Sequence, residues 1–225
     1  MVLSERAVHV LDTIKNRRSI RKYLAAPVEW DKVVTLLEAG RWSPSAGNLQ
    51  EWRFIVVSDL DLKKKVADAC LQQHWIEAAP LIIVIVSLQE KQIEYYGDQG
   101  KQYLYEDAAA AAQNMMLAAT ALDMGSCWIG AFDEQELRDA LKIPDRATPY
   151  IVLTFGYADE KVPVPPRNPL EPLTYLQTFG NRVKNANLVM WDWSLEMERY
   201  AKAAKKEIKS GLRKFFDDVK KRMKK

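Results

Sequence analysis

The stretch from Tyr105 to Met124 most constrains what this chain can fold into. It contains no Pro or Gly and is dense in Ala, Leu and Met, which are among the best helix-forming residues. As a helix these residues would span about 30 Å, roughly the width of a small domain. Apolar residues lie on nearly every face, so the pattern predicts a helix that is buried all round rather than one at the surface.

A glycine and a short strand are predicted directly after this helix. Gly125 stands where a helix commonly ends in a left-handed residue. Ser126 to Ile129 is expected to form a short strand, and Gly130 frees the backbone again. A buried helix that leads into a strand and a glycine turn can direct backbone N–H groups at a ligand. An ordinary core helix followed by a turn gives the same pattern.

The other segments alternate between helical and strand patterns. Ser4 is expected to cap a first helix whose inner face carries Ala7, Val10, Leu11 and Ile14. Further helices are predicted at residues 27–40, 59–73 and 133–141, and strands at residues 52–57, 81–86 and 150–157. Residues 89–104 fit no clear periodicity.

Length and charge divide the chain into two parts. Its 225 residues, 48% of them hydrophobic, suit one folded domain, which we place at residues 1–180, followed by an extension at residues 181–225. Residues 199–225 carry twelve Lys or Arg against three acidic residues, a net charge of +9, whereas the rest of the chain carries −6. Apolar residues recur along this tail at helical spacing. We therefore expect a basic amphipathic helix that packs on the acidic body or on a partner subunit or, as the alternative, binds weakly to anionic lipid or nucleic acid.

Several classes of activity lack support in the sequence. The two cysteines, Cys70 and Cys127, and the two histidines, His9 and His74, have no partner at metal-ligand spacing. The chain contains no GxSxG, P-loop, GxGxxG or HExxH motif. No apolar run is long enough to span a membrane and no signal peptide is recognisable, so we expect a cytoplasmic protein with free thiols.

Two short motifs offer groups that could bind a ligand. Residues 17–21, Arg-Arg-Ser-Ile-Arg, bring together three guanidinium groups and a hydroxyl, which suit a phosphate because guanidinium forks form charge-assisted hydrogen bonds. Residues 43–48, Ser-Pro-Ser-Ala-Gly-Asn, form a loop of small polar residues that can follow the edge of a ligand. The plain alternatives are a solvated basic helix end and a loop that binds nothing.

The chain resembles the FMN-dependent nitroreductase family in three segments that occur in the family's order: RRSIR, SPSAGNLQEWRFIVV and AAQNMMLAATALDMGSCWIGAF. The resemblance runs from about residue 16 to residue 175. It implies an α+β fold in which helices flank a mixed, mostly antiparallel sheet. It also implies a homodimer with FMN at the interface, contacted by both subunits.

The resemblance assigns FMN contacts to four parts of the chain. Arg17, Arg18 and Ser19 would hold the phosphate and ribityl chain, and Arg21 would place a cation near flavin N1 and the C2 carbonyl. The loop of the other subunit would reach the flavin through Pro44, Ser45, Ala46 and Asn48. A turn would pass the reactive edge of the ring at Trp128, Ile129, Gly130 and Ala131. Arg167 would add a second cation at the phosphate.

Two features qualify the resemblance. Many members carry Glu-Gly where this chain has Gly130-Ala131, so backbone contacts could survive there but a side-chain role at Gly130 could not. Residues 89–104 correspond to the region that shapes the substrate cavity. Their tyrosines could stack on a flat substrate as a lid or lie on an ordinary surface, and the Glu, Tyr and Lys clamp of related deiodinases is not apparent.

The activity implied by the resemblance is that of an NAD(P)H-dependent FMN oxidoreductase. NAD(P)H would reduce FMN, leave the site and be replaced by a nitroaromatic, quinone or similar flat acceptor, in a ping-pong sequence. One alternative is another flavin reaction on the same fold, such as reductive dehalogenation or flavin breakdown. Another is a non-catalytic binding protein that acts through its basic tail.

Overall fold

The computed structural model of the protein describes residues 4–182, which belong to two compact units. The larger unit, residues 9–164, contains the sheet and the helices packed on it. The described part of the smaller unit consists of residues 4–8 and 165–182. The basic tail at residues 199–225 lies outside the described residues, and the predicted domain boundary between residues 180 and 181 stays a prediction.

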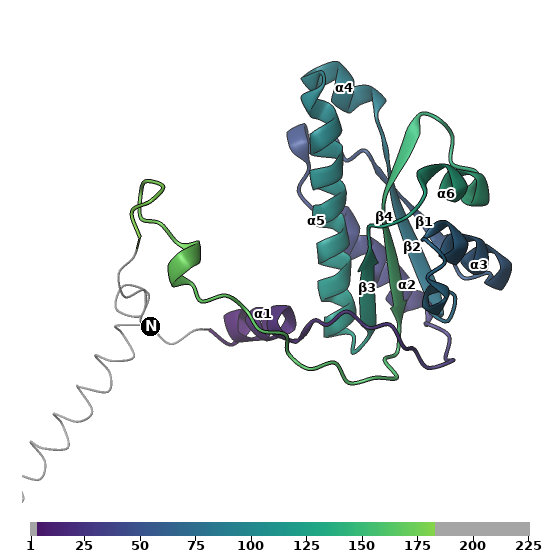
Figure 1. Ribbon diagram of the computed structural model, residues 1–225, viewed down its shortest axis with the longest axis horizontal. Coiled ribbons are helices and arrows are strands. Elements are labelled where there is room, and N and C mark those ends of the chain that lie inside the picture. The colour runs from purple at the N-terminus through teal and green to yellow at the C-terminus, as the bar shows by residue number, and fades with distance from the viewer. Residues whose placement is uncertain (1–3, 183–225) are drawn as a thin grey trace, which may run out of the picture. The chain divides into compact units, whose positions relative to one another are not determined.

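Four strands form one sheet in the order β1–β2–β4–β3 (Figure 1). They are β1 (Trp52–Val57), β2 (Leu81–Leu88), β3 (Gly125–Ile129) and β4 (Ala147–Gly156). All three neighbouring pairs are antiparallel. The prediction of an α+β fold with a mostly antiparallel sheet is therefore confirmed, and parallel pairing within residues 4–182 is confined to a single bridge between Ser19 and Ser126.

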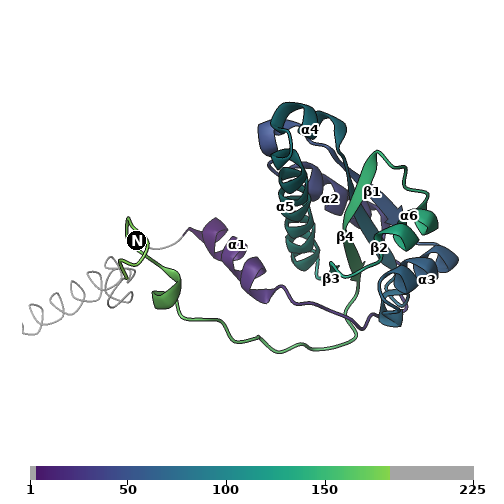
Figure 2. The same ribbon diagram turned by 45° about the horizontal axis from the view of Figure 1, so that its top comes forward.

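Helices cover both faces of the sheet (Figures 1 and 2). One face packs against α2 (Trp30–Arg41) and α5 (Gln99–Ala121), and the other packs against α3 (Leu60–Ala69) and α6 (Glu134–Leu141). Successive residues of β2 point to opposite faces, so Ile83 joins the α2/α5 core and Ile82 joins the α3/α6 core. Since both faces are covered, β2 is buried at every position except its last.

Helix α5 confirms the central prediction, because only Gln113 is exposed between residues 107 and 120. The helix begins at Gln99, earlier than predicted. Residues 89–104, which showed no periodicity, form α4 (Glu90–Tyr96) and the first turns of α5. These helical turns were not predicted, because their many polar and aromatic side chains give no clear apolar periodicity.

The end of α5 corrects the prediction for Gly125. The left-handed residue after the helix is Asp123, with φ 58°, and Gly125 is the first residue of β3. A glycine is needed at this position for a different reason. A Cβ atom added to Gly125 would lie 2.9 Å from the Cβ of Ile20, closer than side chains pack. Gly125 thus allows the chain at Ile20 to approach β3.

Helix α1 (Glu5–Asn16) forms as predicted, and the Ser4 hydroxyl accepts a hydrogen bond from the Ala7 N–H at 3.3 Å. Its expected inner face is not buried within the described chain. Val10, Leu11 and Ile14 are all exposed. The apolar stripe was recognised correctly, but the described part of one chain provides no surface that covers it.

The remaining elements match the predictions apart from their boundaries. The predicted range of β1 is confirmed. Helix α3 ends at Ala69 rather than residue 73, because Leu71 and Gln72 adopt left-handed φ values of 57° and 58°. Short 3₁₀ helices lie at η1 (Ala46–Asn48), η2 (His74–Ile76) and η3 (Glu171–Leu173). No helix among the described residues combines the length and apolarity needed to cross a membrane.

Candidate functional site

Residues 17–21 lie beside the edge strand β3. Ser19 forms the parallel bridge with Ser126, and the Ile20 N–H donates to the Ser126 carbonyl oxygen at 2.9 Å. The side chain of Ile20 packs against Gly125. These contacts use the main chain and one apolar side chain, so the segment is fixed while its polar side chains remain available.

A carboxylate and a phenol hold the end of this segment. One oxygen of Glu160 accepts the N–H groups of Arg21 at 2.6 Å and of Lys22 at 3.0 Å. The hydrogen bond from the Arg21 N–H lowers the pKa of Glu160, so the ionised form is favoured. The Tyr23 hydroxyl donates to the Ile20 carbonyl at 2.6 Å, and burial raises the pKa of this phenol. Glu160 therefore anchors the backbone next to the Arg21 side chain.

Cys127 follows Ser126 in β3 and so lies next to the point where this segment joins the strand. Burial raises the pKa of Cys127, while Arg21, a hydrogen bond with Ser19 and the charge of Arg17 act in the opposite direction. The guanidinium carbon of Arg21 also lies 5.8 Å from the centre of the Trp75 ring, within the range of a cation–π contact. Two guanidinium groups and a hydroxyl beside β3 are donors that suit a phosphate or another anionic group.

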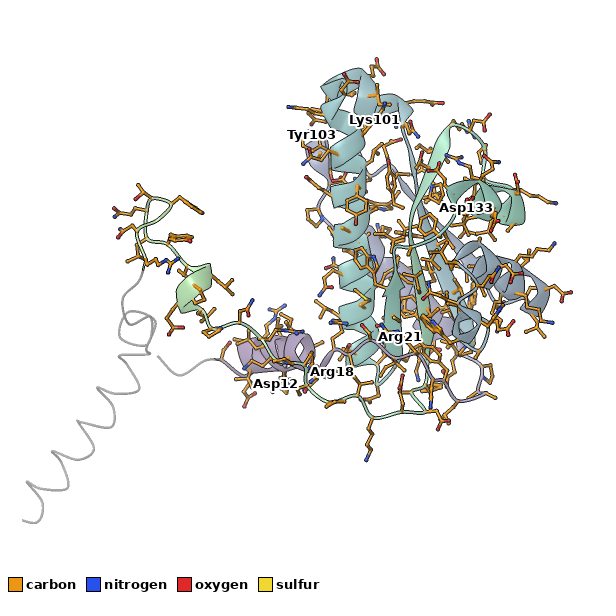
Figure 3. The ribbon with its side chains drawn as sticks, in the orientation of Figure 1. Asp12, Arg18, Arg21, Lys101, Tyr103 and Asp133 are labelled. Atoms are coloured by element: carbon orange, nitrogen blue, oxygen red, sulfur yellow. The ribbon has the colours of Figure 1, made fainter. Side chains whose placement is uncertain are left out.

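Arg18 is engaged differently from these three residues. Its guanidinium donates to the carbonyl oxygens of Lys15 at 2.6 Å and Arg17 at 2.8 Å, at the end of α1. It also lines a pocket of about 420 Å³, together with residues from the end of α5 and residues 158–162. Figure 3 shows Arg18 next to α1 and Arg21 near the lower end of the strands.

The second predicted motif, the loop at residues 43–50, is held by polar side chains of α5. The Asn114 amide donates to the Ser43 hydroxyl at 2.8 Å. The carboxylate of Asp107 accepts the N–H of Ala46 at 2.9 Å. Ser43 and Ala46 are therefore both fixed to α5. Their partners on this helix, Asn114 and Asp107, lie about two turns apart.

The interior of this loop has an unusual backbone. Three of its residues are left-handed, with φ between 53° and 58°: Gly47, Asn48 and Gln50. Only the first is a glycine, and other residues rarely adopt this conformation. The Gln50 amide donates to the Asn48 side-chain oxygen at 3.1 Å, and the Gln50 N–H donates to the Ser45 hydroxyl at 3.1 Å. These bonds hold the strained turn, which leaves Pro44 and Asn48 exposed.

One chain does not bring the loop and the arginine segment together. The loop is bonded to α5 at Asp107, whereas the pocket beside Arg18 includes Thr120. At 1.5 Å per residue these two positions are about 20 Å apart along the helix. Figure 3 shows the same separation, with Tyr103 near one end of α5 and Arg21 near the other.

The predicted turn at residues 128–131 follows β3. Trp128 is half-buried against the α2/α5 core and Ile129 is buried in the α3/α6 core, while Gly130 and Ala131 are exposed. A Cβ added to Gly130 would meet only the Trp128 ring, at 3.5 Å, which is an ordinary contact. Packing within the described chain therefore does not require a glycine at position 130.

Arg167 belongs to the smaller unit, where its guanidinium donates to the Pro166 carbonyl at 3.3 Å. In the same unit the Tyr175 and Phe179 rings lie 4.6 Å apart. The position of Arg167 beside a phosphate stays a prediction. Within residues 4–182, His, Cys, Asp and Glu side chains form no group that could hold a metal ion.

Sequence reasoning missed the polar side chains that hold these segments, namely Asp107, Asn114 and Glu160. A signal was present for the first two, because an acid and an amide in an alanine-rich, buried helix need partners. Glu160 gave no such signal, since it lies in an irregular region far along the chain from the Arg21 and Lys22 N–H groups that it accepts.

Comparisons with known proteins show which family this chain is similar to. The profile of the nitroreductase family matches residues 14–78 and 70–157. A relative from Archaeoglobus fulgidus is 36% identical over 156 residues, which cover 67% of this chain and 87% of the relative. A Bacillus subtilis protein named FMN reductase [NAD(P)H] is 28% identical over 187 residues, covering 77% of this chain and 75% of that protein.

A solved structure agrees as well. That of an FMN-dependent nitroreductase from Clostridium difficile superimposes with a TM-score of 0.66 at 29% identity, covering 75% of this chain and 99% of the other. The resemblance recognised in the three motifs is thereby confirmed. The extent of the family match and the similarity to the Archaeoglobus relative show that this chain belongs to the nitroreductase family.

Proposed function

We propose that the protein is an FMN-dependent oxidoreductase that takes electrons from NAD(P)H and reduces a flat aromatic acceptor such as a nitroaromatic compound or a quinone. The observation that carries this proposal is the placement of residues 17–21, with three arginines and a serine, beside β3 in a chain of the nitroreductase family. When bound, FMN would supply hydride transfer between the two substrates.

The arginine segment would hold the anionic end of the cofactor. Arg17 and Ser19 offer a guanidinium fork and a hydroxyl to the phosphate and ribityl chain, with Arg18 and Arg167 as further cations. Arg21 would lie near flavin N1 and the C2 carbonyl. Because Glu160 fixes its backbone and Trp75 lies beside its guanidinium, this cation can stabilise negative charge without first reorganising.

The turn and the loop would contact the ring. Gly130 and Ala131 are exposed, so their backbone can offer N–H groups to the edge of the flavin. The loop would contribute Pro44, Ser45, Ala46 and Asn48 from a second copy of the chain. Within one chain it is fixed to α5 about 20 Å from the pocket beside Arg18, too far away to share a site directly.

Exposed apolar side chains support a homodimer. On α2, Trp30 is 68% exposed, and Trp42, directly after the helix, is 76% exposed. On α1, Val10 and Ile14 are exposed as well. Large apolar side chains in such numbers are typical of a protein–protein interface, and a second copy that brings the loop would cover part of them.

The spectrum of the purified protein tests the cofactor. We expect absorption bands at roughly 370 and 450 nm, as flavins give, together with consumption of NADH or NADPH that depends on an added quinone or nitroaromatic acceptor. Denatured protein and wild-type protein without acceptor are the controls. Colourless protein that takes up no added FMN would refute the proposal.

Mixed dimers test the shared site. Arg17→Gln and Asn48→Ala should each weaken FMN binding when present in both subunits. If a site takes Arg17 from one subunit and Asn48 from the other, a heterodimer of the two variants has one intact and one doubly altered site. Half the sites of each heterodimer should then bind FMN tightly. If both residues came from the same subunit, no site would recover.

A further inference from the structure

Asp107 is a buried acidic side chain of α5, directly before the run of five alanines, and only 7% of its surface is exposed. One of its oxygens accepts the Ala46 N–H at 2.9 Å. The other accepts the Gln92 side-chain amide at 3.3 Å. Asp107 thus joins three elements, namely the loop at residues 43–50, α4 and α5 (Figure 3 marks this end of α5 by Lys101 and Tyr103).

The contact with α4 is close and buried. Gln92 has no exposed surface, and its side-chain oxygen has no hydrogen-bond partner among the described residues. A Cβ on Gly100 would lie 2.4 Å from the Gln92 carbonyl oxygen, so a glycine lets α4 fold back onto α5. A Cβ on Gly47 would lie 2.4 Å from the Tyr96 hydroxyl, which places α4 directly against the loop.

The loop needs an external restraint of this kind. Asn48 and Gln50 hold left-handed conformations that cost energy in residues other than glycine and persist only where the surroundings impose them. The hydrogen bond from Ala46 to Asp107 lies immediately before this strained stretch. A charged acceptor gives a stronger restraint than a neutral one, at the cost of burying a carboxylate.

We propose that Asp107 is a positioning residue, whose carboxylate sets the loop at residues 43–50 in the conformation that contacts the flavin and links that loop to α4. The inference rests on the proposed function, in which Pro44 to Asn48 reach the flavin of the other subunit. Asp107 itself touches no cofactor. It acts through the Ala46 N–H, so its loss would affect recognition of the flavin ring and leave recognition of the phosphate unchanged.

The test compares two substitutions at the same position. Asp107→Leu removes both acceptors, and Asp107→Asn keeps an oxygen that can accept the Ala46 N–H. We expect the dissociation constants of FMN and of riboflavin to rise together by about 10- to 100-fold in Asp107→Leu, the range for a hydrogen bond to a charged group. Asp107→Asn should stay within about threefold of the wild type, since the acceptor remains.

A matched control separates positioning from general destabilisation. Leu137→Ala opens a cavity on the opposite face of the sheet, where Leu137 is fully buried on α6. It should lower the melting temperature without changing the affinity for either ligand. Amide hydrogen exchange in the protein without cofactor gives a second readout, because the Ala46 N–H should lose protection in Asp107→Leu and keep it in Asp107→Asn.

The outcomes are distinct. Wild-type affinity for both ligands in folded Asp107→Leu, or unchanged protection of Ala46, would overturn the inference. Should Asp107→Leu fail to fold, Asp107→Ser, whose hydroxyl is too short to reach Ala46, is measured against the same two outcomes. If the wild-type protein binds no FMN, the proposed function fails, while hydrogen exchange at Ala46 still decides whether Asp107 sets the loop.

Discussion

The two segments proposed to contact the cofactor are held in opposite ways. The segment at residues 17–21 is fixed through its own main chain, by the edge of β3 and by the Glu160 carboxylate, so the guanidinium groups of Arg17 and Arg21 stay available. The loop at residues 43–50 is fixed by the α5 side chains Asn114 and Asp107, which form hydrogen bonds with Ser43 and Ala46. The first arrangement presents charge, and the second imposes a backbone shape that the loop residues would not adopt on their own.

The largest expected effect is a loss of FMN affinity, and it distinguishes the charged contacts of the arginine segment from the backbone contacts of the loop. Arg17→Gln should weaken FMN binding by about 1.5–3 kcal/mol, the range for charged hydrogen bonds, and leave riboflavin binding nearly unchanged because riboflavin lacks the phosphate. Asn48→Ala should weaken the binding of both ligands by similar factors, since the loop is proposed to contact the ring that they share. Fluorescence titration of each variant with each ligand measures the four dissociation constants. Equal losses of FMN and riboflavin in Arg17→Gln would mean that the arginine acts through folding.

A second prediction concerns the contact that places the arginine segment on β3. Gly125→Ala adds a Cβ 2.9 Å from Ile20 and should destabilise the fold by about 1–3 kcal/mol, as overpacking does. Adding Ile20→Gly removes the Cβ and both γ carbons that the new methyl group would meet, so the double variant should lose less than the two single changes together. Gly130→Ala, whose new Cβ has ordinary contacts, is the matched control for stability in thermal unfolding. Additive losses in the double variant would refute the proposed clash.

The Glu160 anchor should give a pH dependence at the acidic end. Its pKa is lowered by the hydrogen bond from the Arg21 N–H, so its contribution is fully present above its ordinary pKa of 4.5 and is lost as the pH falls through the lowered value. In Glu160→Gln this loss should be absent. Melting temperatures of the wild type and the variant between about pH 6 and pH 3 measure it. Parallel curves would show that Glu160 does not titrate in this range.

The smallest effect is expected in the pH dependence of stability for Asp107→Asn, and its sign is opposite to that for Glu160. Burial raises the pKa of this carboxyl above its ordinary value of 3.8, so its contribution to stability is most favourable below that value and is lost as the pH rises through the raised pKa. The amide in Asp107→Asn does not titrate. The melting temperature of this variant minus that of the wild type should therefore increase as the pH rises. A gain that shrinks with rising pH would contradict this sign.

Much of the fold was predictable because it depends on local patterns. The alanine- and methionine-rich helix and the apolar runs of β1, β2 and β4 have periods that specify their type. Helix α4 was missed because its side chains are mostly polar or aromatic and only Gln92 is buried. The Gly125 prediction was wrong because the sequence shows that a glycine is present but not which atom approaches it. That atom belongs to Ile20, far away in the chain.

Patterns along the chain are enough to predict a buried central helix, a sheet of apolar strands and the motifs of the nitroreductase family. Periodicity and motif order are properties of neighbouring residues, so they can be read along the chain. Only the tertiary structure decided which groups hold the motifs in place, because hydrogen bonds such as those from Ala46 to Asp107 and from Arg21 to Glu160 join residues that folding brings together. It also decided that the loop and the arginine segment lie apart in one chain, since their separation depends on where each contacts its supporting element.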